Sequence, residues 1–321
     1  MPTWGDLLRE IGEEWTNPAT GEVNLDGMRR KYVVRLFELT GRNTVAYYTD
    51  WMGSPRADVS IALQDIHGLM EVFKDLDPKL GLDLLLHSPG GDPTAADSLV
   101  RYMRSKFDDV RVIIPVAAMS AATMWALAAD QIVMGRQSQL GPIDPQMVTP
   151  SGMVPAGAIT RTFERAQTEC AADPSRLGGW MPTLQQYFPG LLEMCDDSTS
   201  LARSLVEEYL RDNMFKDNPA RNDRARVAAD FFADDKIHIA HGRGIHRDQV
   251  EHLSLNIVPL EDDDGELQDR VLTVHHAFMH TFAMNGAVKI TENHLGRAMV
   301  RSILMQAPML AQQGPQNTQH S

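Results

Sequence analysis

VRVIIPVAAMSAATMWALAADQIVM, residues 110–134, is the stretch that decides the fold of this 321-residue chain. Its first part is a β-branched run typical of a buried strand, and after Met119 the pattern changes to that of a buried, Ala-rich helix. Ser120 therefore lies at or next to the N-terminus of a helix, where free N–H groups, including that of Ala121, can face a developing negative charge. A serine before a helix can equally be only a cap, so this stretch alone leaves both roles open.

A second strand and turn, LDLLLHSPGGDP at residues 82–93, precedes that stretch. Asp92 is predicted to cap the following helix and Pro93 to be its first residue. Because Gly90 and Gly91 lack side chains, their N–H groups can approach a ligand oxygen, as an oxyanion hole requires; a plain tight turn is the simpler alternative. The repeated strand–turn–helix unit predicts an α/β fold with a layered, largely parallel core.

Three segments together carry a resemblance to a known family: LDLLLHSPGGDPTAADSLVRYM, VIIPVAAMSAATMWALAADQIVM and QLGPIDPQM. They resemble the serine dehydrogenase proteinase family, whose relatives are signal peptide peptidase A and the Clp proteolytic subunit in the Clp/crotonase superfamily. Further likeness in TGRNTVAYYTDWM, HGRGIHRDQVEHLSLNIVPLE and KITENHLG extends it over most of the chain. The resemblance implies Clp/crotonase-like repeated β-α units and a mostly helical C-terminal half.

The same resemblance implies a serine peptidase with Ser120 as its nucleophile. Gly90, Gly91 and Ala121 are then the oxyanion donors. Two positions depart from the family pattern. Ala122 stands where the family usually has glycine, and Ser88 stands where it usually has threonine before Pro-Gly-Gly. Both departures replace one small residue with another.

A general base is not evident close to Ser120 in the sequence. The related peptidases use either a lysine or a histidine with an acid to accept the proton of the serine. No lysine occurs between Lys106 and Lys216, and residues GPIDP occupy the region where the Clp subunit carries its histidine. The base must therefore come from farther along the chain, from another subunit, or be absent.

His241 is the best candidate for that base, because it matches a histidine of the family and its ordinary pKa suits proton transfer at neutral pH. Lys236 and Lys289 are the next candidates. Asp144 could orient a base, but a carboxylate of ordinary pKa is a poor base for a hydroxyl.

Composition limits which classes of partner and which cellular location are expected. A formal net charge of −13 argues against nucleic acid or an anionic membrane as the main partner. Residues 112–129 carry no charge and just reach the length of a membrane span, but Pro115, Ser120 and Thr123 divide them into strand and helix, so no span is expected. Only two cysteines are present and the N-terminus has no secretory pattern, so a cytoplasmic protein is expected.

No metal or other cofactor is expected. His276 and His280 have metal-compatible spacing on one helical face, but no third ligand is evident. The acidic turn at residues 261–265 lacks the spacing of a calcium loop.

The chain divides by pattern into four segments. The expected segments are an N-terminal arm at 1–27, a Clp/crotonase-like catalytic core at 28–150, a helical region that completes the domain at 151–305, and a disordered tail at 306–321.

Three functions are compatible with these patterns. The first is a serine peptidase acting on a peptide or protein substrate, in a homo-oligomer as the resemblance implies. The second is an acyl-CoA enzyme of crotonase type, which needs a similar oxyanion hole but no serine at position 120. The third is a catalytically inactive, ring-forming scaffold, which the missing base keeps open.

Overall fold

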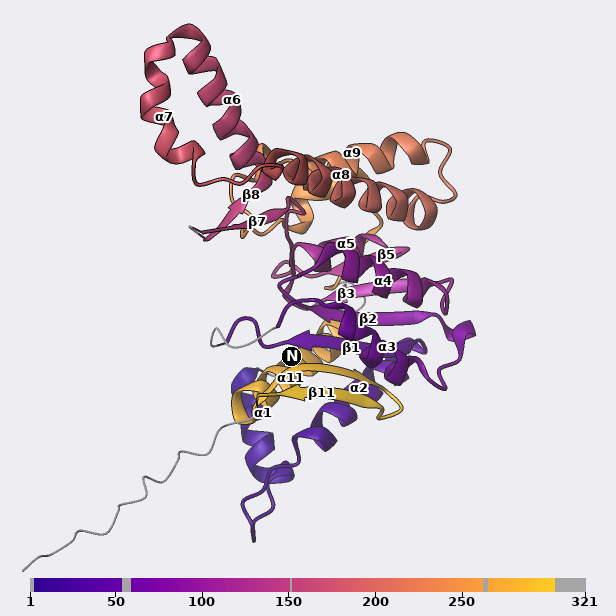
Figure 1. Ribbon diagram of the computed structural model, residues 1–321. Coiled ribbons are helices and arrows are strands. Elements are labelled where there is room, and N and C mark those ends of the chain that lie inside the picture. Colours follow the sequence, from indigo (N-terminus) through magenta and orange to yellow (C-terminus); the bar gives the residue numbers. More distant parts are fainter. Residues whose placement is uncertain (1–2, 54–58, 151, 262–264, 304–321) are drawn as a thin grey trace, which may run out of the picture.

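A seven-stranded sheet forms the centre of the computed structural model, which describes residues 3–53, 59–150, 152–261 and 265–303 (Figure 1). Its strand order is β11-β10-β1-β2-β3-β5-β9. The five strands β1, β2, β3, β5 and β9 are mutually parallel. At one edge β10 pairs antiparallel with β1, and β11 pairs antiparallel with β10. The strands are β1 (Asn43–Thr49), β2 (Leu82–His87), β3 (Val110–Ile114), β5 (Gln131–Met134), β9 (Ile257–Pro259), β10 (Ala287–Asn293) and β11 (Ala298–Ser302). The predicted α/β fold with a largely parallel core is therefore confirmed.

Helices cover both faces of this sheet, as a parallel sheet requires. Side chains that alternate along β1 enter two different cores: Val45 and Tyr47 face one, and Ala46 and Tyr48 face the other. The first core is covered by α3 (Ile66–Phe73), α4 (Pro93–Arg104) and α5 (Ala121–Leu127), and the second by α2 (Leu25–Thr40) and α11 (Glu266–Met284).

Local signals in the sequence fix several of these helices. The Asp92 side chain accepts a hydrogen bond from the N–H of Thr94, and Pro93 begins α4. The cap at Asp92 and the helix start at Pro93 both match the prediction.

The apolar run 112–129 is divided into β3, the short strand β4 (Ala117–Ala118) and α5. No helix within the described ranges is long and apolar enough to cross a bilayer.

The segment after β6 (Gln139–Leu140) builds a second, mostly helical layer. Its elements are the hairpin β7 (Gln146–Thr149) and β8 (Gly152–Pro155), followed by α6 (Ala156–Ala172), α7 (Leu177–Leu184), α8 (Leu191–Tyr209), α9 (Arg221–Ala233) and α10 (Asp235–His238). Helix α8 packs on α5 and α9, while α6 and α7 project away from the body (Figure 1). The chain then returns to the sheet through β9, α11, β10 and β11, so the region after residue 150 contributes three of the seven strands.

Shorter elements complete the description. They are α1 (Trp4–Glu10), the π-helical turns Ile11–Trp15 and Leu210–Met214, and the 3₁₀ turns Leu63–Asp65, Pro78–Leu80, Pro174–Arg176 and Arg247–Leu253. The predicted tail at 306–321 and most of the acidic turn at 261–265 lie outside the described residues. The boundaries of the four predicted segments remain a prediction.

A buried cluster of Tyr48, His87 and His275 lies between β1, β2 and α11. The ring centroid of His87 is 5.6 Å from that of Tyr48 and 5.1 Å from that of His275. Burial lowers the pKa of His87 to about 4 and lowers that of His275 as well. An imidazolium is strongly disfavoured in this environment because it would be separated from water.

This burial predicts acid sensitivity of the fold. The unfolded chain binds a proton at His87 with a pKa near 6.5 and the folded chain only near 4, so stability present above this window is lost as the pH falls through it. Replacing His87→Phe should reduce the loss of unfolding free energy between about pH 7 and pH 4.5 by about 2 kcal/mol, measured by urea denaturation. His67→Gln, at an exposed position, is the control. Equal pH dependence in His87→Phe and the wild type would contradict the prediction.

Candidate active site

Ser120 connects β4 to α5 in an unusual backbone conformation. Its φ is 51° and its ψ is −121°, a region that non-glycine residues rarely occupy and that costs on the order of 1–3 kcal/mol. Although Ser120 occupies the N-cap position of α5, its side chain makes no capping hydrogen bond. The hydroxyl is therefore not used as a cap, and the residue is only partly buried.

The Pro-Gly-Gly turn after β2 packs directly on Ser120. A Cβ atom at Gly90 would lie 2.8 Å from both the Ser120 Cβ and the Ala121 N and would overlap the carbonyl oxygen of Met119. Ser88 fixes the turn, because its N–H donates to Ala117 O at 3.2 Å and its O accepts from Met119 N at 3.0 Å. Glycine at position 90 is thus required by this close approach.

The two glycines of the turn differ in what their N–H groups do. The Gly90 N–H donates to Ser88 Oγ at 3.2 Å. In the described part of the chain, neither the Gly91 N–H nor the Ala121 N–H donates a hydrogen bond. The Gly90 N–H is therefore already occupied, while those of Gly91 and Ala121 have no acceptor among the described residues.

A histidine–carboxylate pair lies in the helical layer. His241 Nδ1 is 2.8 Å from Asp144 Oδ1, and Asp144 Oδ2 also accepts a hydrogen bond from Gln146 Nε2 at 2.8 Å. The Asp144 side chain is 5% exposed and that of His241 is 26% exposed. A buried carboxylate that accepts the Nδ1–H fixes the tautomer and leaves Nε2 as the basic nitrogen.

The same chain brings this pair toward Ser120. A Cβ atom at Gly141 would lie 3.1 Å from the Ser120 N, and Asp144 follows three residues later, a length of chain that spans at most about 10 Å. Leu140, next to Gly141, exchanges two backbone hydrogen bonds with Ile245, which follows His241 by four residues. The segment that carries Asp144 therefore passes beside the serine, and the segment that carries His241 is joined to it at Leu140.

No hydrogen bond joins His241 to Ser120, both of which the structure describes. Such contacts are often long in the absence of substrate and tighten only in the complex.

Neither lysine has a comparable arrangement. Lys289 Nζ donates to both carboxylate oxygens of Asp65, at 2.9 and 2.8 Å, and to Ser60 O at 2.7 Å. These contacts engage its N–H donors and leave no lone pair for base chemistry. Lys236 lies at the surface on α10 beside Asp235 and lines a shallow pocket with Arg161.

Ala122, the departure from the family pattern, is fully buried in the core beneath the sheet. Its methyl group therefore packs inside the protein.

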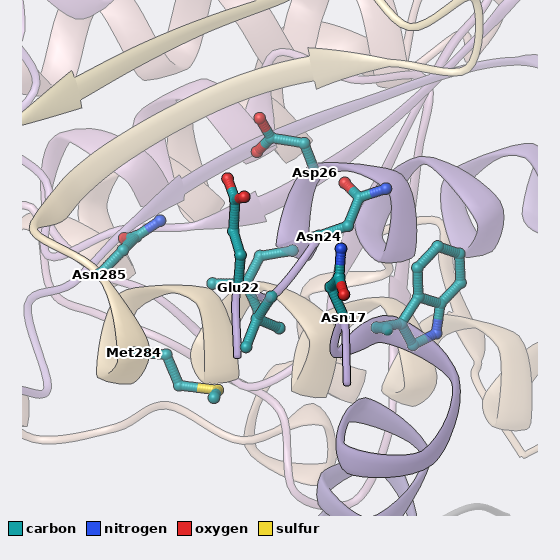
Figure 2. Close-up of a pocket in the computed structure, with 9 residues that line it drawn as sticks. Asn17, Glu22, Asn24, Asp26, Met284 and Asn285 are labelled. Atoms are coloured by element: carbon teal, nitrogen blue, oxygen red, sulfur yellow. The ribbon is translucent and has the colours of Figure 1, made fainter. Parts of the chain in front are cut away.

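A separate pocket of about 630 Å³ lies between the N-terminal arm and the end of α11 (Figure 2). Figure 2 shows Glu22, Asn24 and Asp26 on one side of it and Met284 and Asn285 on another. None of the predicted site residues lines this pocket.

Within the described residues, no group of three histidine, cysteine or carboxylate side chains could hold a metal ion. His280, one of the two histidines with metal-compatible spacing, has its Nε2 atom 3.1 Å from the Trp4 carbonyl oxygen.

Sequence comparison gives partial matches to two relatives. Two uncharacterized proteins of Methanocaldococcus jannaschii are similar to this chain. The first is 34% identical over 113 residues, which are 35% of this chain and 38% of that protein. The second is 31% identical over 105 residues, which are 33% of this chain and 35% of that protein. The chain thus spans little more than a third of the length of these relatives.

Two solved structures are also similar. A mutant of the 1510-N membrane-bound stomatin-specific protease has a TM-score of 0.37 at 14% identity, covering 66% of this chain and 79% of that one. A mutant of ClpP1 from Listeria monocytogenes has a TM-score of 0.34 at 13% identity, and the match covers 71% of this chain and 96% of that one. At these values neither structure supports a conclusion about activity or assembly.

The family comparison is more specific. Residues 60–177 match the model of the ClpP-like SDH-type serine proteinase family. This range includes the Pro-Gly-Gly turn, Ser120 and Asp144, and it ends before His241. The expected resemblance to this family is therefore confirmed over residues 60–177.

Proposed function

We propose that this protein is a serine peptidase that hydrolyses peptide or protein substrates with Ser120 as nucleophile, His241 as general base and Asp144 as the residue that orients the base. The observation that carries the proposal is the Asp144–His241 pair, which lies on the same chain as the strained, uncapped Ser120. The chain passes Ser120 at Gly141, three residues before Asp144. A peptidase is also the coarse function that the family match supports.

The residues have distinct roles in the proposed reaction. His241 Nε2 accepts the hydroxyl proton as Ser120 Oγ attacks the substrate carbonyl carbon, and Asp144 stabilises the resulting imidazolium through Nδ1–H. The carbonyl oxygen becomes an oxyanion that accepts hydrogen bonds from the open N–H groups of Gly91 and Ala121. His241 then protonates the leaving amine, and water hydrolyses the acyl-enzyme by the same steps.

Gly90 has a supporting role in this proposal. Its N–H is engaged by Ser88 Oγ, so it holds the shape of the turn rather than the oxyanion.

The alternatives do not require these features. A crotonase-type acyl-CoA enzyme needs the backbone donors but neither the serine nor the paired histidine, and a scaffold needs none of them. The Asp144–His241 pair, together with an uncapped Ser120, favours the peptidase over both.

Assembly is part of the proposal. Val148 and Met153, on the β7–β8 hairpin, are 78% and 67% exposed, and large apolar side chains at the surface favour contact between subunits. We therefore propose a homo-oligomer whose active sites are each built within one chain.

A cytoplasmic location is also proposed, since Cys170 and Cys195 are both free.

The nucleophile is tested by covalent labelling. A fluorophosphonate should label the wild type, and Ser120→Ala should abolish labelling and peptide hydrolysis. Because the side chain makes no capping bond, we expect the unfolding free energy of Ser120→Ala to change by less than about 1 kcal/mol. Unchanged hydrolysis in Ser120→Ala would refute the peptidase proposal.

The base is tested by two substitutions of different severity. His241→Ala should lower kcat by at least about 10³-fold, since both the base and the acid of the reaction are lost. Asp144→Asn preserves the size of the side chain but no longer stabilises the correct tautomer and the imidazolium, so kcat should also fall, by about 10²-fold or more. Full activity in His241→Ala would refute the assignment and leave Lys236 as the next candidate.

The location of the base within one chain is tested by mixing. Ser120→Ala and His241→Ala proteins, combined and allowed to exchange subunits, should remain inactive if each site is built within one chain. Restored activity would mean that His241 acts on the serine of a neighbour.

The oligomeric state is tested by light scattering. The wild type should have a mass of several chains, and an active monomer would contradict the proposed assembly.

A further inference from the structure

A buried ion pair lies behind the Pro-Gly-Gly turn, between β10 and the start of α3. Lys289 Nζ is 2.9 and 2.8 Å from the two carboxylate oxygens of Asp65. Both side chains are 1% exposed. Two charges are removed from water here, which is tolerated only when further hydrogen bonds satisfy both groups.

Those further bonds go to one short backbone segment. Lys289 Nζ donates to the carbonyl oxygen of Ser60 at 2.7 Å, and Asp65 Oδ2 accepts from the N–H of Ala62 at 3.0 Å. The pair therefore holds the chain on both sides of Ile61.

Ile61 in turn holds the Pro-Gly-Gly turn. Its N–H donates to Gly90 O at 2.7 Å, and its O accepts from Asp92 N at 3.0 Å. These two bonds bracket Gly91. A Cβ atom at Gly91 would lie 3.0 Å from Ile61 Cα and would overlap the Ile61 backbone, so the turn is pressed against this segment.

The opposite side of the same turn contacts Ser120 through Gly90. The network also reaches the nucleophile helix, since Tyr47 Oη donates to Asp65 Oδ2 at 2.7 Å and the Tyr47 ring packs edge-on against Trp125 of α5 at 5.2 Å. The distance between the Gly91 N–H and Ser120 is therefore set by contacts that converge on Asp65.

We propose that Lys289 and Asp65 form a positioning pair that holds the Gly91 N–H at the oxyanion position relative to Ser120. This inference rests on the proposed peptidase function. The pair does not touch the substrate; it acts through Ile61 and the turn. Since a displacement of about 1 Å at a reacting centre can lower the rate by about 10²-fold, a loosened turn should reduce turnover more than substrate binding.

The test replaces the pair with apolar residues, which often maintain stability when both charges are removed together. The variant is Lys289→Met with Asp65→Leu. A matched control exists on the same strand: Glu292 pairs with Arg29 at 2.8 Å, with side chains 0% and 1% exposed, in the core on the other face of the sheet. The control variant is Arg29→Met with Glu292→Leu.

Two readouts separate positioning from general stability. In the folded Lys289→Met/Asp65→Leu protein, kcat for a peptide substrate should fall by at least about tenfold while KM changes by less than about threefold. Hydrogen exchange at the amides of Ile61 and Asp92 should accelerate. The Arg29/Glu292 control should show neither change. A kcat within about twofold of the wild type, or an equal fall in the control, would overturn the inference.

If the double variant does not fold, Asp65→Asn provides the test, because the amide keeps the shape of the side chain but removes the charge and one of the two acceptor oxygens. We expect a kcat lowered by at least about threefold at unchanged KM, and an unchanged kcat would overturn the inference. Failure of the proposed function has a different signature, since the wild type would then show no fluorophosphonate labelling at Ser120. A wild type that labels and turns over, with variants of the pair that turn over equally well, refutes only the positioning role.

Discussion

Backbone contact between the Pro-Gly-Gly turn and Ser120 governs the architecture of this protein. The absence of a Cβ atom at Gly90 lets the turn meet the Ser120 Cβ and the Ala121 N, and the bonds of Ser88 to Ala117 and Met119 lock the two segments together. The serine adopts a positive φ at this junction, a strained geometry that persists only when its surroundings over-determine it. Strain of this kind is concentrated where a side chain must be presented to a ligand.

Sheet topology explains how these groups meet. Strands β2 and β3 are parallel neighbours, so their carboxyl ends lie at the same edge. The turn follows β2 directly, and the serine follows β3 after the short strand β4. Open α/β sheets place their ligand sites at this edge. The helical layer pairs Asp144 with His241, while β10 brings Lys289 from the far end of the chain to the segment behind the turn.

The parts of this arrangement that rest on local chemistry could be predicted from the sequence. Asp92 and Pro93 begin a helix wherever they occur in this pattern, and the change of periodicity at Met119 marks the junction that contains Ser120. His241 and Asp144 could be named as base and orienting residue, but their contact joins residues 97 apart, which periodicity does not report.

Other features of the site and the sheet could not be predicted, because they depend on hydrogen bonds and strand pairing between distant parts of the chain. The sequence does not distinguish Gly90 from Gly91 as a donor; the bond from the Gly90 N–H to Ser88 Oγ does. Lys289 is a candidate base by residue type, yet its Nζ donates to Asp65 and Ser60 in the structure. The place of β10 and β11 in the sheet also has no local signal comparable to the strand–turn–helix units, because the pairing of β10 with β1 joins opposite ends of the chain.

A structure of the protein after reaction with a fluorophosphonate would locate both the nucleophile and the oxyanion donors in one measurement. We predict a bond from Ser120 Oγ to phosphorus, with the phosphoryl oxygen about 3 Å from the N atoms of Gly91 and Ala121 and His241 still paired with Asp144. An adduct on another residue, or a phosphoryl oxygen directed away from both N–H groups, would contradict this description of the active site.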